Sequence, residues 1–173
     1  KDFISPDAPA IYPEELRADI DALNVIIYAD FNLAVNLAAL VTNQKDYEYY
    51  YDRIFARLDW LEERLSKQRY LMGDTITDSD IRIFPTLARF DLVFYQKYLV
   101  NRKRLVDYPN LWNYAKDLYS NPAFGGTTDF DSMRKRFYYV DHTPFEDLPR
   151  LIPKGPDDSI WLEPNDRAEK FGK

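Results

Sequence analysis

Cysteine is absent from the 173 residues of this chain, and histidine occurs only once, as His142. Without a thiol, the chain by itself forms no disulfide, no thiolate metal site and no covalent intermediate on cysteine. The Asp-rich positions between residues 129 and 158 lack the ligand order of a calcium loop, so no metal site is predicted. His142 has no nucleophile with a predictable partner, and we interpret it as a loop residue without a catalytic role.

A basic excess and a long apolar run are missing as well. The formal net charge is -6 and the pI is near 4.9, whereas neutralising phosphates or anionic lipids requires a basic surface patch. The longest apolar stretch, residues 33–41, is interrupted by Asn36 and is far shorter than the roughly 20 residues of a membrane span. We therefore expect a soluble, intracellular protein that binds no nucleic acid and has no membrane span; cytoplasm and organelle interior are not distinguished.

Helical periodicity runs through most of the sequence, in which 46% of the residues are hydrophobic. Pro13 is followed by two glutamates, the pattern of a helix start, and later apolar residues recur at alternating spacings of three and four. The predicted helices cover residues 13–41, 44–67, 78–98, 108–121 and 129–139. The sequence therefore predicts an all-α domain of about five helices around one core.

A capping motif separates the second predicted helix from the third. Thr77 and Asp80 have the spacing of a capping box, in which each side chain bonds a backbone amide of the other residue. We interpret both residues as a structural cap worth about 1 kcal/mol rather than as catalytic groups.

The composition divides the chain into three parts. Residues 1–12 are predicted to be a Pro-rich connector, 13–141 a helical domain, and 142–173 an extended Pro/Asp-rich tail with little periodicity. The chain begins at Lys1 with neither a methionine nor a signal-peptide pattern, which is expected of a processed or partial product.

Several separate motifs occur in an order that is similar to one family. Residues 70–80, from Tyr70 through the Gly-Asp turn to Asp80, resemble the capping-box segment in the C-terminal domain of cytosolic glutathione transferases. Other segments resemble the glutathionyl-hydroquinone reductase branch of that superfamily, and the resemblance covers roughly residues 8–142. These segments are 12–17, 81–84, 89–91, 107–112 and 129–139.

The resemblance implies a glutathione-transferase C-terminal-like helical bundle. It also implies a thioredoxin-like domain elsewhere, whose active-site cysteine removes glutathione from a glutathionylated hydroquinone. Glutathione is accordingly expected as a cofactor only if such a domain is present, and no cofactor is expected in this chain. In the family the helical domain supplies the quinone-side pocket and the dimer interface, so a homodimer is implied as possible.

Three positions depart from the family pattern. Asn36 stands where the family usually has a pocket tyrosine, and a shorter amide moves the hydrogen-bond donor and removes the ring. Residues 94–100, beginning at Phe94, replace a His- and Cys-containing stretch with apolar and aromatic groups. Of a pair of aromatic hydroxyls, only that of Tyr138 remains. The resemblance thus assigns Asn36, Phe94 and Tyr138 to a substrate pocket, and no catalytic residue is predicted.

Two functional hypotheses follow. In the first, the retained fold and altered pocket indicate a domain that has lost catalysis and serves as a structural or accessory subunit, with a protein partner in a larger assembly. In the second, the chain is a fragment of an active glutathionyl-hydroquinone reductase whose thioredoxin-like domain is absent. We prefer the first, because truncation does not explain Asn36. In neither is the chain alone expected to be active.

Overall fold

The computed structural model describes residues 9–139 and 151–172, and the regular structure in these two ranges is helical. The α-helices are α1 (Arg17–Ile27), α2 (Ala34–Leu40), α3 (Gln44–Leu65), α4 (Asp78–Arg89), α5 (Tyr95–Lys97), α6 (Pro109–Ser120), α7 (Pro122–Gly125), α8 (Phe130–Tyr139) and α9 (Arg167–Phe171). Shorter 3-10 turns are η1 (Glu14–Leu16), η4 (Leu105–Asp107) and η5 (Asp158–Leu162), and π-helical turns are η2 (Tyr28–Asn32) and η3 (Phe90–Phe94). The predicted all-α fold is confirmed.

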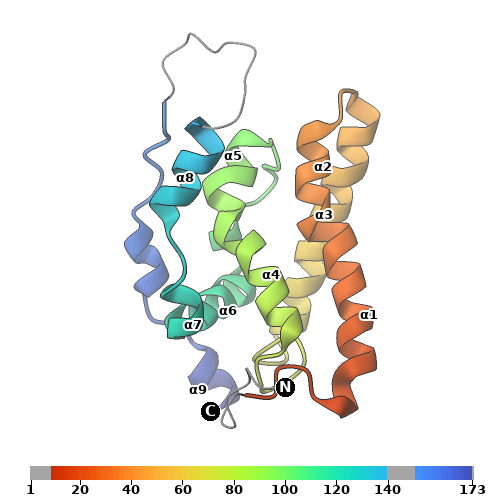
Figure 1. Cartoon of the computed structure of the whole chain (residues 1–173), viewed down its shortest axis with the longest axis vertical. Coiled ribbons are helices and arrows are strands. Elements are labelled where there is room, and N and C mark those ends of the chain that lie inside the picture. The colour runs from red at the N-terminus through yellow and green to blue at the C-terminus, as the bar shows by residue number, and fades with distance from the viewer. Residues whose placement is uncertain (1–8, 140–150, 173) are drawn as a thin grey trace, which may run out of the picture.

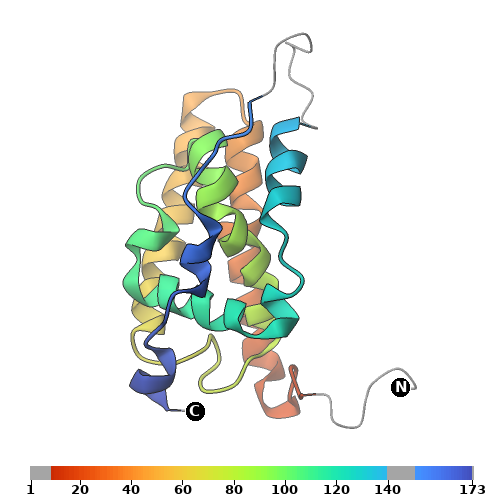
Figure 2. The same cartoon turned by 90° about the vertical axis from the view of Figure 1, so that its left-hand side faces the viewer.

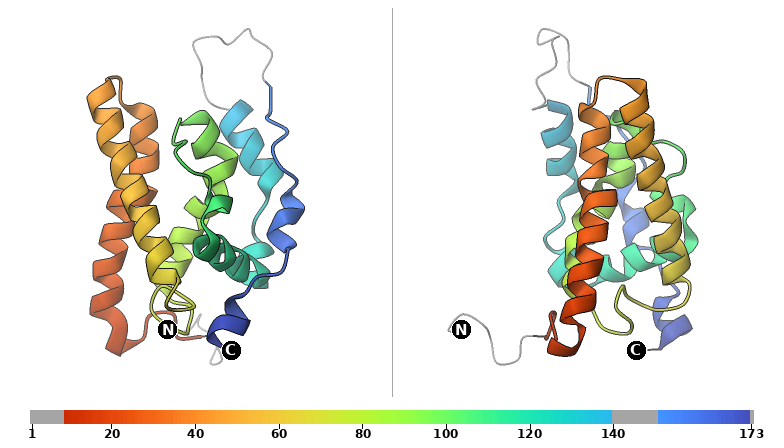
Figure 3. Two further views of the ribbon diagram at one scale, coloured as in Figure 1. Left: turned by 180° about the vertical axis from the view of Figure 1, so that it is seen from behind. Right: turned by 90° about the vertical axis from the view of Figure 1, so that its right-hand side faces the viewer.

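The helices form an elongated bundle (Figure 1). The elements α1, η2 and α2 make one rod, and α3 runs back along it, as the view from behind also shows (Figure 3). A second rod of α4, η3 and α5 lies between this pair and α8, while α6 and α7 cross the bundle below α8 (Figures 1 and 2). The core is centred where η2, α3 and η3 meet, with Phe90 against Phe31 at 5.9 Å and against Phe55 at 6.3 Å between ring centroids.

The first rod is longer than the apolar stretch at residues 33–41. Glu14–Leu40 is long and apolar enough, by length and composition, to cross a membrane, a test that the core helix of a soluble protein also passes. One face of this segment packs on the bundle: Ile20 and Phe31 are fully buried, and Asp30 pairs with arginines of α3. The other face is open, since 33% of its most apolar window is buried and Val25 and Tyr28 are exposed.

The start of α4 carries the predicted capping box. Asp80 is fully buried, and its Oδ2 accepts hydrogen bonds from the Thr77 amide at 2.8 Å and the Thr77 hydroxyl at 2.9 Å. Its Oδ1 accepts from the Leu71 amide at 3.0 Å and the Tyr114 hydroxyl at 2.7 Å. The carboxylate therefore joins the turn before α4, the start of α4 and the middle of α6.

The C-terminal segment is more structured than the extended tail that the sequence predicts. Two short helices, η5 and α9, interrupt it, and it runs down one side of the bundle (Figure 2). Arg167 of α9 is fully buried, and its guanidinium donates to the carbonyl oxygens of Leu65, the last residue of α3, and of Gln68 and Arg69 in the turn that follows. Residues 140–150, which include His142, lie outside the described part of the chain.

Candidate functional site

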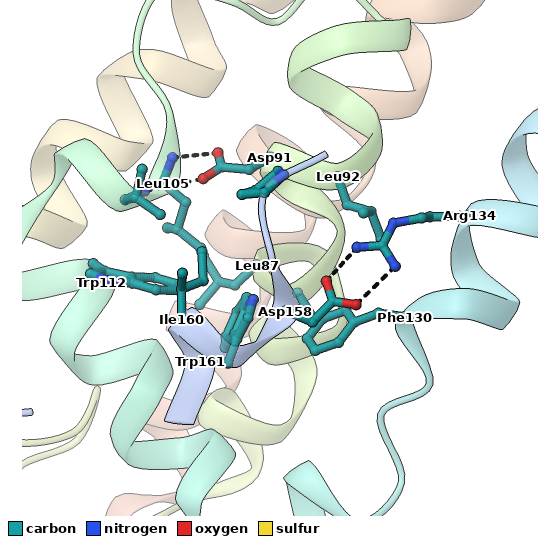
Figure 4. Close-up of a pocket in the computed structure, with 13 residues that line it drawn as sticks. Leu87, Asp91, Leu92, Leu105, Trp112, Phe130, Arg134, Asp158, Ile160 and Trp161 are labelled. Atoms are coloured by element: carbon teal, nitrogen blue, oxygen red, sulfur yellow. Dashed lines mark hydrogen bonds and ion pairs between the residues drawn. The ribbon is translucent and has the colours of Figure 1, made fainter. Parts of the chain in front are cut away.

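A small pocket lies where the second rod meets the C-terminal segment (Figure 4). It has a volume of about 30 Å³ and is mostly apolar in its lining. The lining residues are Leu87, Ala88, Asp91, Leu92, Leu105, Val106, Trp112, Phe130, Arg134, Pro156, Asp158, Ile160 and Trp161. These residues come from α4, η3, η4, α6, α8 and the segment around η5, so that the pocket brings together parts of the chain that are far apart in sequence.

The polar groups of this pocket are engaged within the protein. Asp91 accepts hydrogen bonds from the Leu105 amide at 2.6 Å and the Val106 amide at 3.2 Å, which caps η4 (Figure 4). Burial raises the pKa of Asp91, while the two amide hydrogen bonds oppose that rise. Arg134 forms a two-point ion pair with Asp158, and the hydrogen bonds that its guanidinium donates to the Asp158 carboxylate raise the pKa of Arg134. These groups hold loops and the tail in place, while Nε of Arg134 is buried without a hydrogen-bond partner in the described structure.

The aromatic wall of the pocket has a structural role as well. Trp161 of η5 packs against Trp112 of α6 at 4.7 Å, Phe130 of α8 at 5.4 Å and Phe84 of α4 at 6.3 Å between ring centroids. Such a cluster of edge-on and tilted rings is typical of a packed core. Trp161 therefore anchors the C-terminal segment on three helices.

A wider hollow of about 610 Å³ adjoins this region, within the size range of small-molecule sites. It shares Asp91, Val106, Trp112, Pro156 and Ile160 with the small pocket and adds Tyr95, Gln96, Arg104 and Glu163. Arg104 is already paired with Asp107 at 2.8 Å. Neither hollow is lined by Asn36, Phe94 or Tyr138.

The structure places the three predicted pocket residues on different elements. Phe94 is buried, with its ring 6.2 Å from that of Phe137, the neighbour of Tyr138 on α8. The Tyr138 hydroxyl donates to the Leu92 carbonyl at 3.2 Å, and burial raises the pKa of Tyr138. Phe94 and Tyr138 therefore belong to one packed region between η3 and α8. Asn36 lies on α2, on the other side of the second rod (Figure 1).

Asn36 is half-buried and donates from Nδ2 to the Asn32 carbonyl at 2.9 Å. Asn32 in turn donates to the Arg82 carbonyl of α4 at 3.1 Å, and its Oδ1 is buried without a partner in the described structure. Asn32 thus joins the first rod to α4, whereas Asn36 bonds within the first rod. No described hydrogen bond joins Asn36 to Phe94 or Tyr138, so their membership of one site stays a prediction.

Sequence reasoning missed the residues that hold the C-terminal segment. The folded chain brings Arg134 together with Asp158 and Trp161, and this contact cannot be predicted from any local spacing in the sequence. The tryptophan in an otherwise polar tail was the available signal, because a large apolar ring is seldom left without a packing partner.

Comparison with known proteins finds both a family model and relatives that match this chain. The family model for the C-terminal domain of glutathione S-transferase matches residues 44–117. The glutathionyl-hydroquinone reductase PcpF of Sphingobium chlorophenolicum is 37% identical over 145 residues, which are 84% of this chain and 46% of PcpF. The glutathionyl-hydroquinone reductase YqjG of Escherichia coli strain K12 is 34% identical over 171 residues, which are 99% of this chain and 51% of YqjG.

A solved structure extends the match. A glutathione transferase from Gordonia bronchialis has a TM-score of 0.92 and 44% sequence identity, covering 99% of this chain and 53% of that protein. Fold and sequence together make this chain a C-terminal helical domain of the glutathione S-transferase superfamily. Within that superfamily it is similar to the glutathionyl-hydroquinone reductases, and it spans about half the length of the relatives it matches.

These matches contradict the functional hypothesis preferred from the sequence. A domain that has lost catalysis and serves as a structural or accessory subunit is not supported. The reason is that the proteins matching along 84% to 99% of this chain are themselves named as reductases and transferases. The substitution at Asn36 is therefore no evidence of lost chemistry.

Proposed function

We propose that this chain is the helical, aromatic-substrate side of a glutathione-dependent transferase of the glutathionyl-hydroquinone reductase class. The observation that carries the proposal is the identity of 37% and 34% to two proteins named as such reductases, spread along 84% and 99% of this chain. A TM-score of 0.92 to a glutathione transferase supports it at the level of the backbone.

The reaction requires a thiol that this chain does not contain. A cysteine thiolate attacks the sulfur of glutathionyl-hydroquinone, the bond from sulfur to the ring breaks, and the ring carbon takes up a proton. Glutathione then reduces the resulting mixed disulfide, so the sum is glutathionyl-hydroquinone plus glutathione giving hydroquinone plus oxidised glutathione. We propose that glutathione and the thiol belong to a thioredoxin-like domain, while this helical domain holds the ring.

Proteins of this superfamily are commonly dimeric, and we propose the same for this one: a homodimer working inside the cell. An intracellular location fits the reaction, because glutathione is the reductant and the cytosol keeps it reduced.

The test uses the protein expressed from its complete coding sequence. Purified protein is mixed with glutathione and the glutathionyl adduct of unsubstituted hydroquinone, and hydroquinone and oxidised glutathione are quantified by liquid chromatography. Catalysed, equimolar formation of the two products is expected. Folded protein that accelerates neither product above the uncatalysed rate would refute the proposed function.

A further inference from the structure

The wider hollow beside the C-terminal segment carries chemistry that the proposed reaction does not use. Its volume of about 610 Å³ is large enough for a small molecule. The segment around η5 lines it with Pro156, Ile160 and Glu163, and the rest of the lining comes from η3, α5, α6 and the loop before α6. Figure 4 shows Asp91, Trp112 and Ile160, which line both this hollow and the small pocket.

The uncompensated charge on this lining is negative. Asp91 accepts hydrogen bonds from two backbone amides, and among the described residues neither Asp91 nor Glu163 has an ion pair. Arg104, the arginine of the lining, donates to both carboxylate oxygens of Asp107, at 3.0 Å and 2.8 Å, and Asp107 lies outside the lining. The charge of Arg104 is therefore balanced, while two carboxylates of the hollow lack a cationic partner.

Asp91 has room for a further donor. A carboxylate offers about four acceptor positions, and the two amides occupy two of them. Burial raises the pKa of Asp91 more than the amides and the nearby Arg104 lower it. A cation that entered the hollow would offset the cost of burying this carboxylate, because burial disfavours a charge that has no counter-ion.

Tyr95 adds an aromatic ring to the same place. It follows Asp91 by four residues, about one helical turn, so that both side chains lie on the same side of the helix formed by η3 and α5. Tyr95 is half-buried, and no ring contact or hydrogen bond of its side chain is described. A tyrosine ring attracts a cation that lies within about 6 Å of its face.

We propose that this hollow binds a small organic ammonium ion with a planar, apolar body. The carboxylates of Asp91 and Glu163 attract the ammonium group, and the ring of Tyr95 adds a cation–π contact. The side chains of Val106 and Ile160 pack against the apolar body. This inference goes beyond the proposed function, because no step of that reaction uses these residues.

The experiment compares three indoles that share one planar body and differ in charge at pH 7. Tryptamine is a cation, tryptophol is neutral and indole-3-propionate is an anion. Isothermal titration calorimetry of the protein expressed from its complete coding sequence gives the dissociation constant of each. Tryptamine is expected to bind roughly ten-fold or more tightly than either of the others, because a hydrogen bond between two ionised groups is about twice as strong as a neutral one.

Variants assign the binding to the hollow. Glu163→Gln alters an exposed side chain with no described partner, and it should weaken tryptamine binding about three-fold without changing tryptophol binding. Tyr95→Leu should weaken tryptamine binding about three-fold through the lost cation–π contact. Glu169→Gln removes the same charge from an exposed residue of α9 outside the lining, and as the matched control it should change neither affinity.

Asp91→Asn should weaken tryptamine binding roughly ten-fold, because the Asp91 carboxylate is the more buried of the two. Asp91 also holds the start of η4, so this variant counts only if its melting temperature equals that of the unaltered protein. Glu163→Gln decides in either case.

Equal affinities for tryptamine and tryptophol, or no saturable binding of tryptamine, would overturn the assignment. Equal effects of Glu163→Gln and Glu169→Gln would also overturn it, because the attraction would then come from the overall negative charge of the protein. The measurement requires no turnover, so its outcome is independent of whether the proposed reaction occurs.

Discussion

Asp80 shows how one residue serves several elements. Its carboxylate accepts four hydrogen bonds, from Leu71, Tyr114 and the amide and hydroxyl of Thr77, and it has no exposed surface. Burial raises the pKa of Asp80, and the four hydrogen bonds oppose that rise. A fully buried group of this kind stabilises only while all its partners remain, since each orphaned donor adds its own desolvation cost.

Asp80→Ala is therefore expected to lower the free energy of unfolding by about 3 to 5 kcal/mol, because several buried donors lose their acceptor and each costs roughly 1 to 3 kcal/mol when left unsatisfied. Thr77→Val, which keeps the carboxylate and the amide donor at position 77, should cost about 1 kcal/mol. Urea titrations followed by circular dichroism measure both. A loss for Asp80→Ala no larger than that for Thr77→Val would contradict the argument.

The ion pairs of Asp30 make the stability of the protein depend on pH in the acid range. Burial by itself raises the pKa of this carboxyl, but hydrogen bonds from Arg57, at 2.6 Å, and from Arg53 outweigh it and lower the pKa below its ordinary value of 3.8. A lowered folded pKa gives stability that is complete above the ordinary pKa and is lost as pH falls through the folded pKa. Asp30 therefore stabilises the protein at neutral pH and ceases to do so in acid.

Asp30→Asn should cost about 1 kcal/mol at pH 7, a modest figure because Arg53 is partly exposed. The difference from the unaltered protein should shrink below about pH 4, where the native carboxyl is itself protonated. Melting temperatures recorded from pH 7 to pH 3 test this. A difference that stays constant across the range would exclude the ion pairs as its cause.

Among the helices, the C-terminal segment is bound to the bundle by polar contacts at two points. Arg134 pairs with Asp158, the first residue of η5, and Arg167 of α9 donates to carbonyls at and just after the end of α3. Helix ends leave carbonyl groups without partners, so a buried guanidinium that satisfies three of them joins two distant parts of the chain.

Arg167→Leu is expected to cost about 2 to 4 kcal/mol and to release α9, since three buried carbonyls lose their donor. Hydrogen exchange should accelerate in α9 and in the last turn of α3 while α1 stays protected. Lys170→Leu is the matched control: among the described residues, the Lys170 ammonium donates to the Asn110 side chain at 2.9 Å and lies over the ring of its neighbour Phe171, and its replacement should leave exchange unchanged. Unaltered exchange in Arg167→Leu would mean that α9 docks by apolar contact alone.

The same elements show what the sequence could and could not predict. Local patterns suffice for the helix predicted at 44–67, which spans Gln44–Leu65, and for the capping box at Thr77, because propensity and capping act over a few residues. The π-helical turns and the short helices of the tail depend on tertiary contacts. Arg167, polar and in a polar segment, meets carbonyls about a hundred residues away, and no periodicity encodes that contact.

The candidate site was harder to predict than the fold for a related reason. The resemblance directed attention to Asn36, Phe94 and Tyr138, but Phe94 is packed in the core and Asn36 lies on another rod. The inference that pocket substitutions imply lost catalysis is contradicted by the matches to proteins named as reductases, because three positions compared with a family pattern do not establish what a site can do.

For the whole molecule, the proposed reaction assigns binding of the ring and bond breaking to different parts of the protein. In the proposed reaction the helical domain holds the ring, and a thiol outside this sequence attacks the sulfur. Iodoacetamide treatment of the protein expressed from its complete coding sequence should abolish turnover of glutathionyl-hydroquinone, while mass spectrometry finds no alkylated cysteine in the peptides of this chain.

The dissociation constant of the aromatic ligand should change by no more than about two-fold after that treatment, because the groups that hold the ring carry no thiol for iodoacetamide to alkylate. Prior saturation with glutathionyl-hydroquinone should slow inactivation, since substrate bound to the helical domain shields the thiol. Turnover that persists after complete alkylation would place the nucleophile among hydroxyl, amine or carboxylate groups. Binding lost together with turnover would show that one part of the protein performs both tasks.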